Sequence, residues 1–235
     1  MPRRRAAPLD RQKIVRVALG LIDREGLEAL SMRRVARELR VEAMSLYYYV
    51  ASKEELIDAC IEQVSASLDL SGMQAPGPWR DRVKAGFTAY RALAHAHPHL
   101  FALVGRRPVQ RLEVLRPMEV ALSVFADAGF TPAQSMRGFR IVNSFVYGYA
   151  LSELTGLAVL AASSDPLAGD LADFPNLARA LPHARDVEAD TEFEDGLDTI
   201  LDGITTWLTP PPQQPAHGLG NSRAAPPSKG TRSES

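Results

Sequence analysis

The chain has 235 residues, 46% of them hydrophobic, and a formal net charge of −1 at pH 7. This length is enough to bury a sizeable core and leaves room for two compact units. The single cysteine, Cys60, excludes an internal disulfide, and we expect it to be a small buried residue, with a redox sensor as the alternative. Long stretches rich in Ala, Leu and Arg, without runs of alternating Val, Ile and Thr, predict an all-α fold.

Hydropathy and the distribution of charge indicate where the protein acts and which kind of partner it binds. No apolar run reaches the roughly 18–20 residues of a membrane span, and the basic start lacks the apolar core of a signal peptide, so we expect a cytoplasmic protein without a membrane partner. Residues 1–53 carry twelve Lys and Arg against six Asp and Glu, whereas residues 161–208 carry two against eleven. A polyanion would be drawn to the basic end, although a solvated basic face would show the same pattern.

The first 70 residues contain start and stop signals for several helices. Asp10 can cap a first helix that Gly26 ends, and Ser31 can cap a short second helix. Ser52 and Glu55 form a capping box in front of a longer helix. The helices predicted for this unit, residues 10–70, cover about 11–25, 32–38, 42–49 and 53–68.

Residues 71–78, rich in Gly and Pro, mark a boundary before a second helical unit at 78–208. Pro117 is expected to kink the helix that contains it. The predicted helices cover about 79–95, 99–104, 109–128, 132–160 and 191–208, with a loop at 161–189 that contains one turn near 176–181, and disorder is predicted for a basic arm at 1–9 and a tail at 209–235.

Two short helices around a three-residue turn, at about residues 31–53, match the geometry that places a second helix in the major groove of DNA. An apolar face would hold this recognition helix, and its outer face offers groups for base edges, thymine methyls and phosphates. Because consecutive helical residues point in different directions, we expect one of its three tyrosines to be a core residue. The inward residues are Val41, Leu46 and Val50, and the outward ones are Ala43, Met44, Ser45, Tyr47, Tyr48 and Tyr49.

Candidate phosphate-binding groups flank the recognition helix. Ser31, Arg33 and Arg34 lie at the start of the preceding helix, and Lys53 lies at the start of the following one. Phosphate contacts fix the register of a protein on DNA, while base contacts specify the sequence. The same residues also have simpler interpretations. Arg33 and Arg34 could be ordinary solvated arginines, and Met44 could be a residue that only fills space.

Residues 21–59, LIDREGLEALSMRRVARELRVEAMSLYYYVASKEELIDA, resemble the DNA-binding domain of the tetracycline-repressor (TetR) family. The resemblance covers about residues 10–60. The second half is similar to the C-terminal domain of the tetracycline-repressor subgroup. The matching stretches are Gly26-Leu27, Ser31–Ala36, Val41-Glu42, Ser45–Tyr47 and Lys53, then His97–Leu100, Arg107-Pro108, Ala128–Phe130, Tyr147–Tyr149 and Phe193–Leu197.

The resemblance implies an all-helical homodimer, with a three-helix helix-turn-helix domain joined to a helical effector-binding and dimerisation domain. It implies a transcriptional repressor that a small-molecule effector releases from a palindromic operator in double-stranded DNA. The dimer face would come from the helices at about 132–160 and 191–208. In the family, phosphates are held from the positions of Ser31, Arg33, Tyr47 and Lys53, and bases are read from those of Arg33, Ala43, Met44, Ser45 and Tyr48.

Two positions depart from the family pattern. Arg40 stands in the turn where the family usually has Gly, so either the arginine adopts a left-handed backbone, at a cost of roughly 1 kcal/mol, or the turn is shifted. A further interpretation is that Arg40 adds a phosphate contact. Tyr49 stands where the family often has His, and its hydroxyl can still reach a phosphate.

The second unit offers residues for an apolar effector pocket with a few polar handles, although the same residues could equally be plain core. The founding family member binds a magnesium–tetracycline complex, and its metal-binding histidine aligns with Leu103, which cannot ligate magnesium. We therefore expect no tetracycline sensing of that kind, no metal and no cofactor other than an unidentified effector. The candidate pocket residues are Trp79, Phe87, Tyr90, His99, Phe101, Leu103, Arg107, Phe125, Phe139, Asn143 and Tyr147.

Three closely spaced histidines lie at the end of one predicted helix and the start of the next. His95, His97 and His99 suggest a metal site, but residues two apart on a helix point away from each other and Pro98 interrupts the helix. A helix end with pocket-lining histidines is therefore favoured.

Two other functions are alternatives to DNA binding. A small-molecule enzyme lacks support, because the sequence has no glycine-rich phosphate loop, Ser/His/Asp order or Cys/His ligand spacing. A helical interaction module without DNA binding is favoured only by Arg40.

Overall fold

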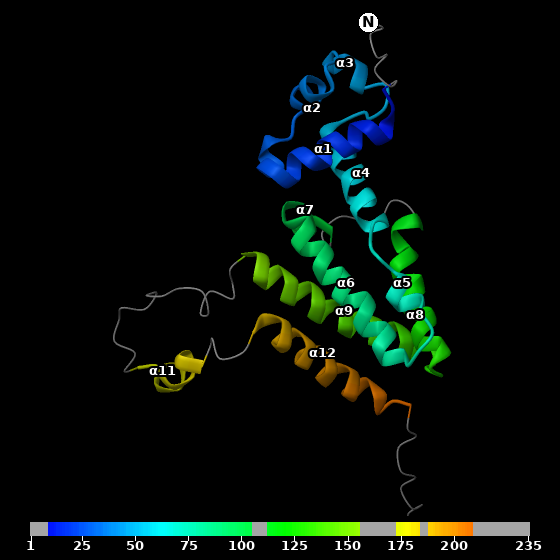
Figure 1. The fold of residues 1–235 in the computed structure, drawn as a ribbon, viewed down its shortest axis with the longest axis vertical. Helices are drawn as coiled ribbons and strands as arrows, with labels where there is room; N and C mark the ends of the chain where they lie inside the picture. Colours follow the sequence, from blue (N-terminus) through cyan, green and yellow to red (C-terminus); the bar gives the residue numbers. More distant parts are fainter. Residues whose placement is uncertain (1–8, 105–111, 156–172, 184–187, 209–235) are drawn as a thin grey trace, which may run out of the picture.

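Figure 1 shows a computed structural model that describes residues 9–104, 112–155, 173–183 and 188–208. These residues form helices and no strand, which confirms the predicted all-α fold. Not one of the described helices combines the length and apolar character that crossing a membrane requires. The helices are α1 (Arg11–Glu25), α2 (Met32–Leu39), α3 (Ala43–Leu46), α4 (Lys53–Ala66), α5 (Ser71–Gln74), α6 (Trp79–Ala96), α7 (Pro98–Val104), α8 (Arg116–Asp127), α9 (Pro132–Thr155), α11 (Pro175–Ala180) and α12 (Ala189–Thr205), with 3₁₀ turns at Leu27–Ala29, Leu112–Leu115 and Leu181–His183.

Side-chain caps set where the N-terminal helices begin. Asp10 and Ser31 each accept a hydrogen bond from the backbone N–H three residues on, at 2.7 and 3.2 Å. Ser52 accepts one from Glu55 in the same way at 3.0 Å. The Glu55 carboxylate in turn accepts from the backbone N–H of Ala51 at 2.7 Å, one residue before the position that a capping box predicts. The predicted starts of these three helices are confirmed.

Helices α1 to α4 enclose the first hydrophobic core. Ile14 and Leu21 of α1 and Leu56 of α4 are fully buried in it. Cys60 also lies in this core, where its Sγ is 3.7 Å from the backbone carbonyl oxygen of Val15. Burial raises the pKa of Cys60 to about 12, so the thiol stays protonated at neutral pH. The interpretation of Cys60 as a small buried residue is confirmed.

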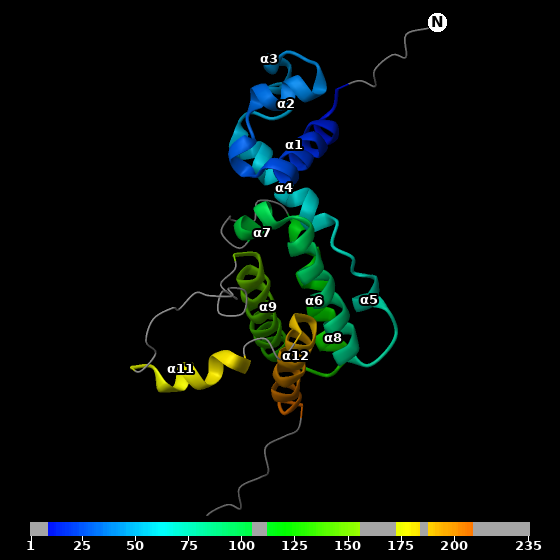
Figure 2. The same ribbon diagram turned by 60° about the vertical axis from the view of Figure 1, so that its left-hand side comes forward.

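Helices α6, α8, α9 and α12 surround the second core, and Figure 2 shows α12 beside α9. Trp79, Phe125 and Phe130 form an aromatic cluster in it, with ring centroids 5.7, 5.2 and 5.5 Å apart. Gly196 permits the close approach of α12 to α9, because a Cβ there would lie 2.6 Å from Cζ of Phe145. The second core therefore holds in place the two helices that the family resemblance assigns to the dimer face.

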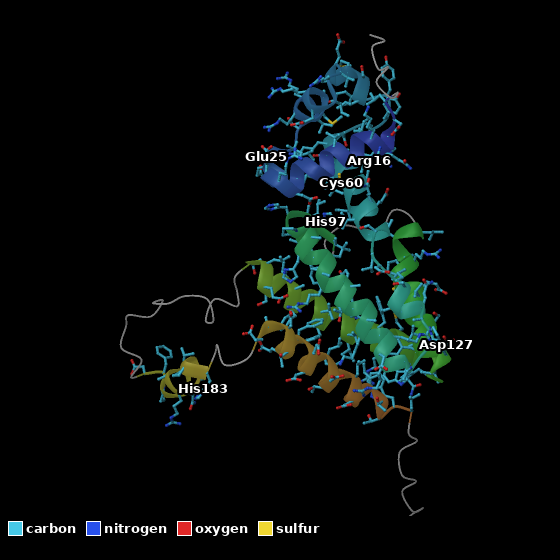
Figure 3. The ribbon with its side chains drawn as sticks, viewed as in Figure 1. Arg16, Glu25, Cys60, His97, Asp127 and His183 are labelled. Atoms are coloured by element: carbon cyan, nitrogen blue, oxygen red, sulfur yellow. The ribbon has the colours of Figure 1, made fainter. Side chains whose placement is uncertain are left out.

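Helix α7 connects the first core to a small third cluster, against which Tyr90 of the second core also packs. Leu100 is buried in the first core, whereas its neighbour Phe101 is buried beside Ala150 of α9. His97, directly before α7, has its Nδ1 3.0 and 3.1 Å from the two carboxylate oxygens of Asp23 on α1. Figure 3 places His97 at this junction, below α1. A movement of α7 therefore acts on the N-terminal unit through both a buried leucine and a polar contact.

Several predicted elements are corrected by the structure. The recognition helix predicted at 42–49 is α-helical only over Ala43–Leu46 and continues as a turn. Pro117 lies in the first turn of α8 instead of kinking a longer helix, because proline fits where no backbone N–H partner is needed. The boundary at 71–78 contains α5, whereas the turn predicted near 176–181 is confirmed by α11 and the 3₁₀ turn that follows it. The predicted arm and tail lie outside the described residues, except Leu9, which packs against the first core.

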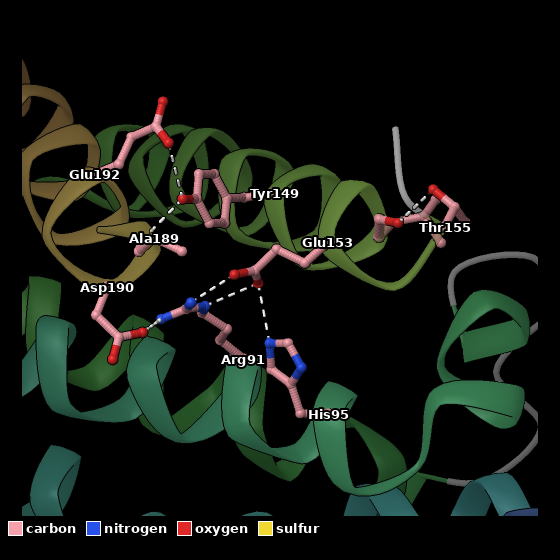
Figure 4. Close-up of polar contacts among 9 residues, drawn as sticks. Arg91, His95, Tyr149, Glu153, Thr155, Ala189, Asp190 and Glu192 are labelled. Carbon is pink, nitrogen blue, oxygen red and sulfur yellow. Dashed lines mark hydrogen bonds and ion pairs between the residues drawn. The ribbon is translucent and has the colours of Figure 1, made fainter. Parts of the chain in front are cut away.

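Arg91 of α6 fastens α9 and α12 together (Figure 4). Its guanidinium donates to the two carboxylate oxygens of Glu153 at 2.9 and 2.5 Å and to Asp190 at 2.8 Å. The guanidinium carbon lies 4.7 Å from the ring centroid of Phe193, and His95 Nε2 lies 3.0 Å from Glu153. Partial burial alone would raise the pKa of Glu153, but the hydrogen bonds from Arg91 and His95 hold it below its usual value.

We expect Arg91→Ala to lower the free energy of unfolding by about 2–4 kcal/mol, because it leaves the largely enclosed carboxylate of Glu153 without its main partner. Urea unfolding at pH 7 measures this loss. Arg24→Ala is the matched control, since Arg24 is exposed on α1 and its loss should change stability by less than about 0.5 kcal/mol. Equal stability of the Arg91→Ala variant and the wild type would contradict the role given to this contact.

The same network predicts a pH dependence. A carboxylate whose pKa is lowered by folding stabilises the protein above the pKa of the unfolded chain, and the contribution is lost as pH falls through the lowered value. Glu153→Gln keeps the shape of the side chain and removes its charge. The stability difference between the wild type and this variant should be constant near neutral pH and shrink below about pH 4.3. A difference that grows on acidification would show that the sign is wrong.

Candidate DNA-binding surface and effector cavity

The turn between α2 and α3 contains a residue with a left-handed backbone. Arg40 has φ 57° and ψ 43°, so the turn is not shifted and the arginine takes the conformation that suits Gly. The N–H of Arg40 donates to the carbonyl oxygen of Arg37 at 3.1 Å, and that of Val41 donates to Ala36 at 3.0 Å. These bonds satisfy carbonyl groups at the end of α2. The conformation costs an arginine about 1 kcal/mol or more.

The residues of α3 and the turn after it present a polar and aromatic surface to solvent. Leu46 and Val50 are buried and anchor this segment to the first core. The prediction that one of the three tyrosines is a core residue is wrong, because the chain leaves the helix after Leu46 and three consecutive side chains face solvent. The exposed fractions are 89% for Tyr48, 69% for Met44, 45% for Tyr47 and 39% for Tyr49, with Ala43 and Ser45 half-buried between them.

The groups predicted to hold phosphates differ in their availability. Ser31 and Arg33 are exposed at the start of α2, and Lys53 is the first residue of α4. Arg34 instead donates from Nη2 to both carboxylate oxygens of Glu25 on α1, at 2.8 and 3.0 Å. A phosphate would have to displace this carboxylate. The position of Arg34 therefore suits the fastening of α2 to α1 better than a DNA contact.

A cavity of about 150 Å³ lies in the second unit, where α4, α5, α6, α7, α8 and α9 meet. Among the described residues, no charged side chain lines it, and its main polar groups come from Ser65, Tyr90 and Asn143. Burial, with a smaller contribution from Tyr147, raises the pKa of Tyr90, so its phenol is neutral. The other lining residues are Leu68, Leu70, Met73, Gly86, Phe87, Leu93, Phe101, Val104, Val114, Pro117, Met118, Ala121 and Phe139.

The predicted pocket residues fall into two groups. Phe87, Tyr90, Phe101, Phe139 and Asn143 line this cavity together. The others lie elsewhere because their helices turn them toward different neighbours. Phe125 and Trp79 belong to the aromatic cluster of the second core, and Leu103 packs against the first core. The exposed His99 lies beside Gly26, and the hydroxyl of Tyr147 donates to the Ala102 carbonyl at 3.4 Å. Arg107 is outside the described residues.

Sequence reasoning missed several wall residues. Met73 belongs to the segment that was interpreted as a boundary, so its role depends on the unexpected helix α5. Pro117 and Met118 reach the cavity because α8 begins there. A proline followed by methionine is a sequence signal for a helix start at this position. The packing of α8 on α6 is needed to show that these two residues face the cavity.

The three histidines do not converge. His95 contacts Glu153 and His97 contacts Asp23, on different helices. Within the described ranges, no group of three or more His, Cys, Asp or Glu side chains has the arrangement of a metal site. Two of the histidines therefore make contacts between helices.

Comparisons with known proteins agree with this architecture. A sequence family described as bacterial regulatory proteins of the tetR family matches residues 14–60, and the tetracyclin repressor-like C-terminal domain matches residues 72–208. The chain therefore belongs to the TetR family. It is a DNA-binding transcriptional regulator.

Individual relatives support the same assignment. An HTH-type transcriptional regulator of Saccharopolyspora erythraea is 29% identical over 201 residues, which cover 83% of this chain and 84% of the relative. The HTH-type transcriptional repressor DrrR1 of Streptomyces coeruleorubidus is 34% identical over 60% of this chain and 53% of its own length. The TetR family protein ActR of Streptomyces coelicolor, solved with actinorhodin, is 28% identical with a TM-score of 0.71, over 87% of this chain and all of that one.

We expect Arg33→Ala and Lys53→Ala to weaken DNA binding and each to reduce the slope of log affinity against log salt by about 0.9, because each removes one phosphate contact. Arg34→Gln should leave the slope unchanged. Tyr48→Ala should change the preferred sequence and not the slope. Fluorescence titration of a duplex selected by the protein from a random library, at several salt concentrations, measures all four. A slope that falls most for Arg34→Gln would contradict this assignment.

Proposed function

We propose that the chain is a homodimeric repressor that leaves a pseudo-palindromic operator when a neutral, mainly apolar small molecule enters the cavity. Residues 10–70 would bind the operator in the cytoplasm, and residues 78–208 would bind the effector and form the dimer. The observation that carries the proposal is the position of α7. Its neighbouring residues Leu100 and Phe101 lie in the core of the DNA-binding unit and in the cavity wall.

The outward side of α9 supports a dimer. Met136 and Ile141 are 40% and 38% exposed there, and an isolated protomer leaves these large hydrophobic side chains in water. A two-fold axis would pair this face with itself and place two recognition helices about 34–36 Å apart, or a multiple of that distance, along DNA. The groove on this face is lined by Ala133, Met136, Arg137, Arg140, Ile141 and Ser144.

The size of the cavity supports a mechanism for release. The cavity is only partly enclosed, and its volume of about 150 Å³ is smaller than the 300–1,000 Å³ or so that drug-sized ligands occupy. A larger effector would push the wall outward, and the wall includes Phe101 and Val104 of α7 and Ser65 of α4. Displacement of α7 would move Leu100 and disturb the contact of His97 with Asp23. The two DNA-binding units of the dimer would then be spaced wrongly for the operator.

The chemistry of the wall supports the class of effector. Bringing a carboxylate or phosphate into this cavity would leave a charge without a partner among the described lining residues, which is costly. The side chain of Asn143 and the hydroxyls of Tyr90 and Ser65 can hydrogen-bond to carbonyl or hydroxyl groups. The ActR structure with actinorhodin shows that a related regulator binds a small molecule. A neutral molecule with a few such oxygens fits best.

We expect Ile141→Glu to convert the dimer into monomers, because it places two carboxylates across the two-fold axis, and to weaken operator binding by roughly 100-fold through the loss of bivalency. Sedimentation velocity gives the mass, and a duplex selected from a random library gives the affinity. Leu112→Glu is the matched control, since Leu112 is 81% exposed outside α9 and should stay dimeric. The dimer proposal fails if Ile141→Glu remains dimeric. The operator proposal fails separately if the selected duplexes lack two-fold symmetry.

A thermal-shift screen with pairs of neutral and carboxylated polycyclic aromatic compounds tests the class of effector. At about 100 times its dissociation constant, a neutral compound should raise the Tm by roughly 5–10 °C, and its carboxylated partner should not. Asn143→Leu removes a polar handle and keeps the volume, so it should weaken the same compound by about tenfold while the Tm without ligand hardly changes. Equal shifts from carboxylated and neutral partners would contradict a neutral effector.

A further inference from the structure

The outer face of α2 carries a row of arginines. Arg33 and Arg37 are four residues apart in α2, which places them on one side of the helix, and Arg40 follows at the C-cap in the left-handed turn. All three are exposed. The row begins at the N-terminal end of α2 and ends in the turn that leads to the recognition helix, so it follows the whole length of the helix.

Two other arginines of the DNA-binding unit are paired within the fold, whereas these three are not. Arg34 pairs with Glu25 at 2.8 Å, and Arg11 pairs with Glu55 at 3.6 Å. Within the described part of the chain, no hydrogen bond or ion pair joins Arg33, Arg37 or Arg40 to another residue. The row is therefore a strip of positive charge that the protein itself leaves without a counter-ion.

The backbone of Arg40 is an independent observation. Its φ of 57° is the only positive φ of a residue other than Gly among the described residues. Gly would take this conformation without strain, and strained residues that persist in a fold cluster at functional sites. The exposed side chain makes no contact within the described protein that would compensate for the strain. The side chain is therefore available to a partner outside the protein.

We propose that Arg33, Arg37 and Arg40 form a phosphate-binding ridge that follows one DNA strand, so that Arg37 joins the phosphate contacts that the sequence suggested for Arg33 and Arg40. The inference rests on the DNA binding of this family and refines its geometry. In helix-turn-helix proteins the helix before the recognition helix crosses the DNA backbone, which is where such a ridge would lie.

Arg37→Gln and Arg40→Gly test the ridge, with full-length protein and a fluorescent 30-base-pair duplex of mixed sequence as the probe. Phosphate contacts do not depend on sequence, so no operator has to be known. Each variant should weaken binding by roughly five- to tenfold and reduce the salt slope by about 0.9. Arg24→Ala, which removes an exposed charge from α1, should change neither quantity and serves as the control.

Arg40→Gly gives a second readout with the opposite sign. Relief of the left-handed strain should raise the Tm by about 2–4 °C while DNA binding becomes weaker, so weaker binding cannot be attributed to unfolding. Wild-type affinity and salt slope in both variants would overturn the ridge, and so would weaker binding of Arg40→Gly together with a lower Tm. DNA binding by this family would still hold if Lys53→Ala weakened the complex. Absence of salt-dependent binding by the wild type would instead contradict DNA binding itself.

Discussion

The packing of α7 between the first core and the wall of the cavity is the interaction on which the rest of this structure depends. Leu100 and Phe101 are adjacent in the chain, yet one is buried under the DNA-binding unit and the other in the wall of the cavity. Leu100 cannot move far without opening a space in a close-packed core. In the proposed mechanism, a change of cavity volume that displaces Phe101 is therefore felt at the DNA-binding unit. The contact of His97 with Asp23 adds a polar link at the same junction.

Charged side chains have partners within the protein in some parts of the molecule and not in others. Arg91 pairs with Glu153 and Asp190 and thereby joins helices, and Arg34 is engaged in the same way by Glu25. Because these charges are already paired, they stabilise the fold and are poorly available to a ligand. The described lining of the cavity carries no charge, and the outer face of α2 carries charges without partners. The cavity therefore suits a neutral molecule, and the α2 face suits a polyanion.

Local sequence signals predicted the parts of the structure that depend on neighbours in the chain. The caps at Asp10, Ser31 and Ser52 were found because a side-chain oxygen and the N–H three residues later define a helix start. Tertiary packing decided the rest. Phe125 could not be separated from Phe139 by sequence, since both are aromatic residues on amphipathic helices and only one faces the cavity. The engagement of Arg34 by Glu25 joins two helices and leaves no local signal.

The coupling of the cavity to DNA binding is tested most directly by reciprocal affinities. The dissociation constant of the wild-type protein for a selected duplex is measured with and without a saturating cavity-binding compound, and that of the compound is measured with and without DNA. Linkage requires both ratios to be equal, and typical couplings predict about 5- to 150-fold weaker binding in each direction. In Leu100→Ala both ratios should fall toward one. A wild-type ratio of one, for a compound that Asn143→Leu weakens, would contradict transmission from the cavity through α7.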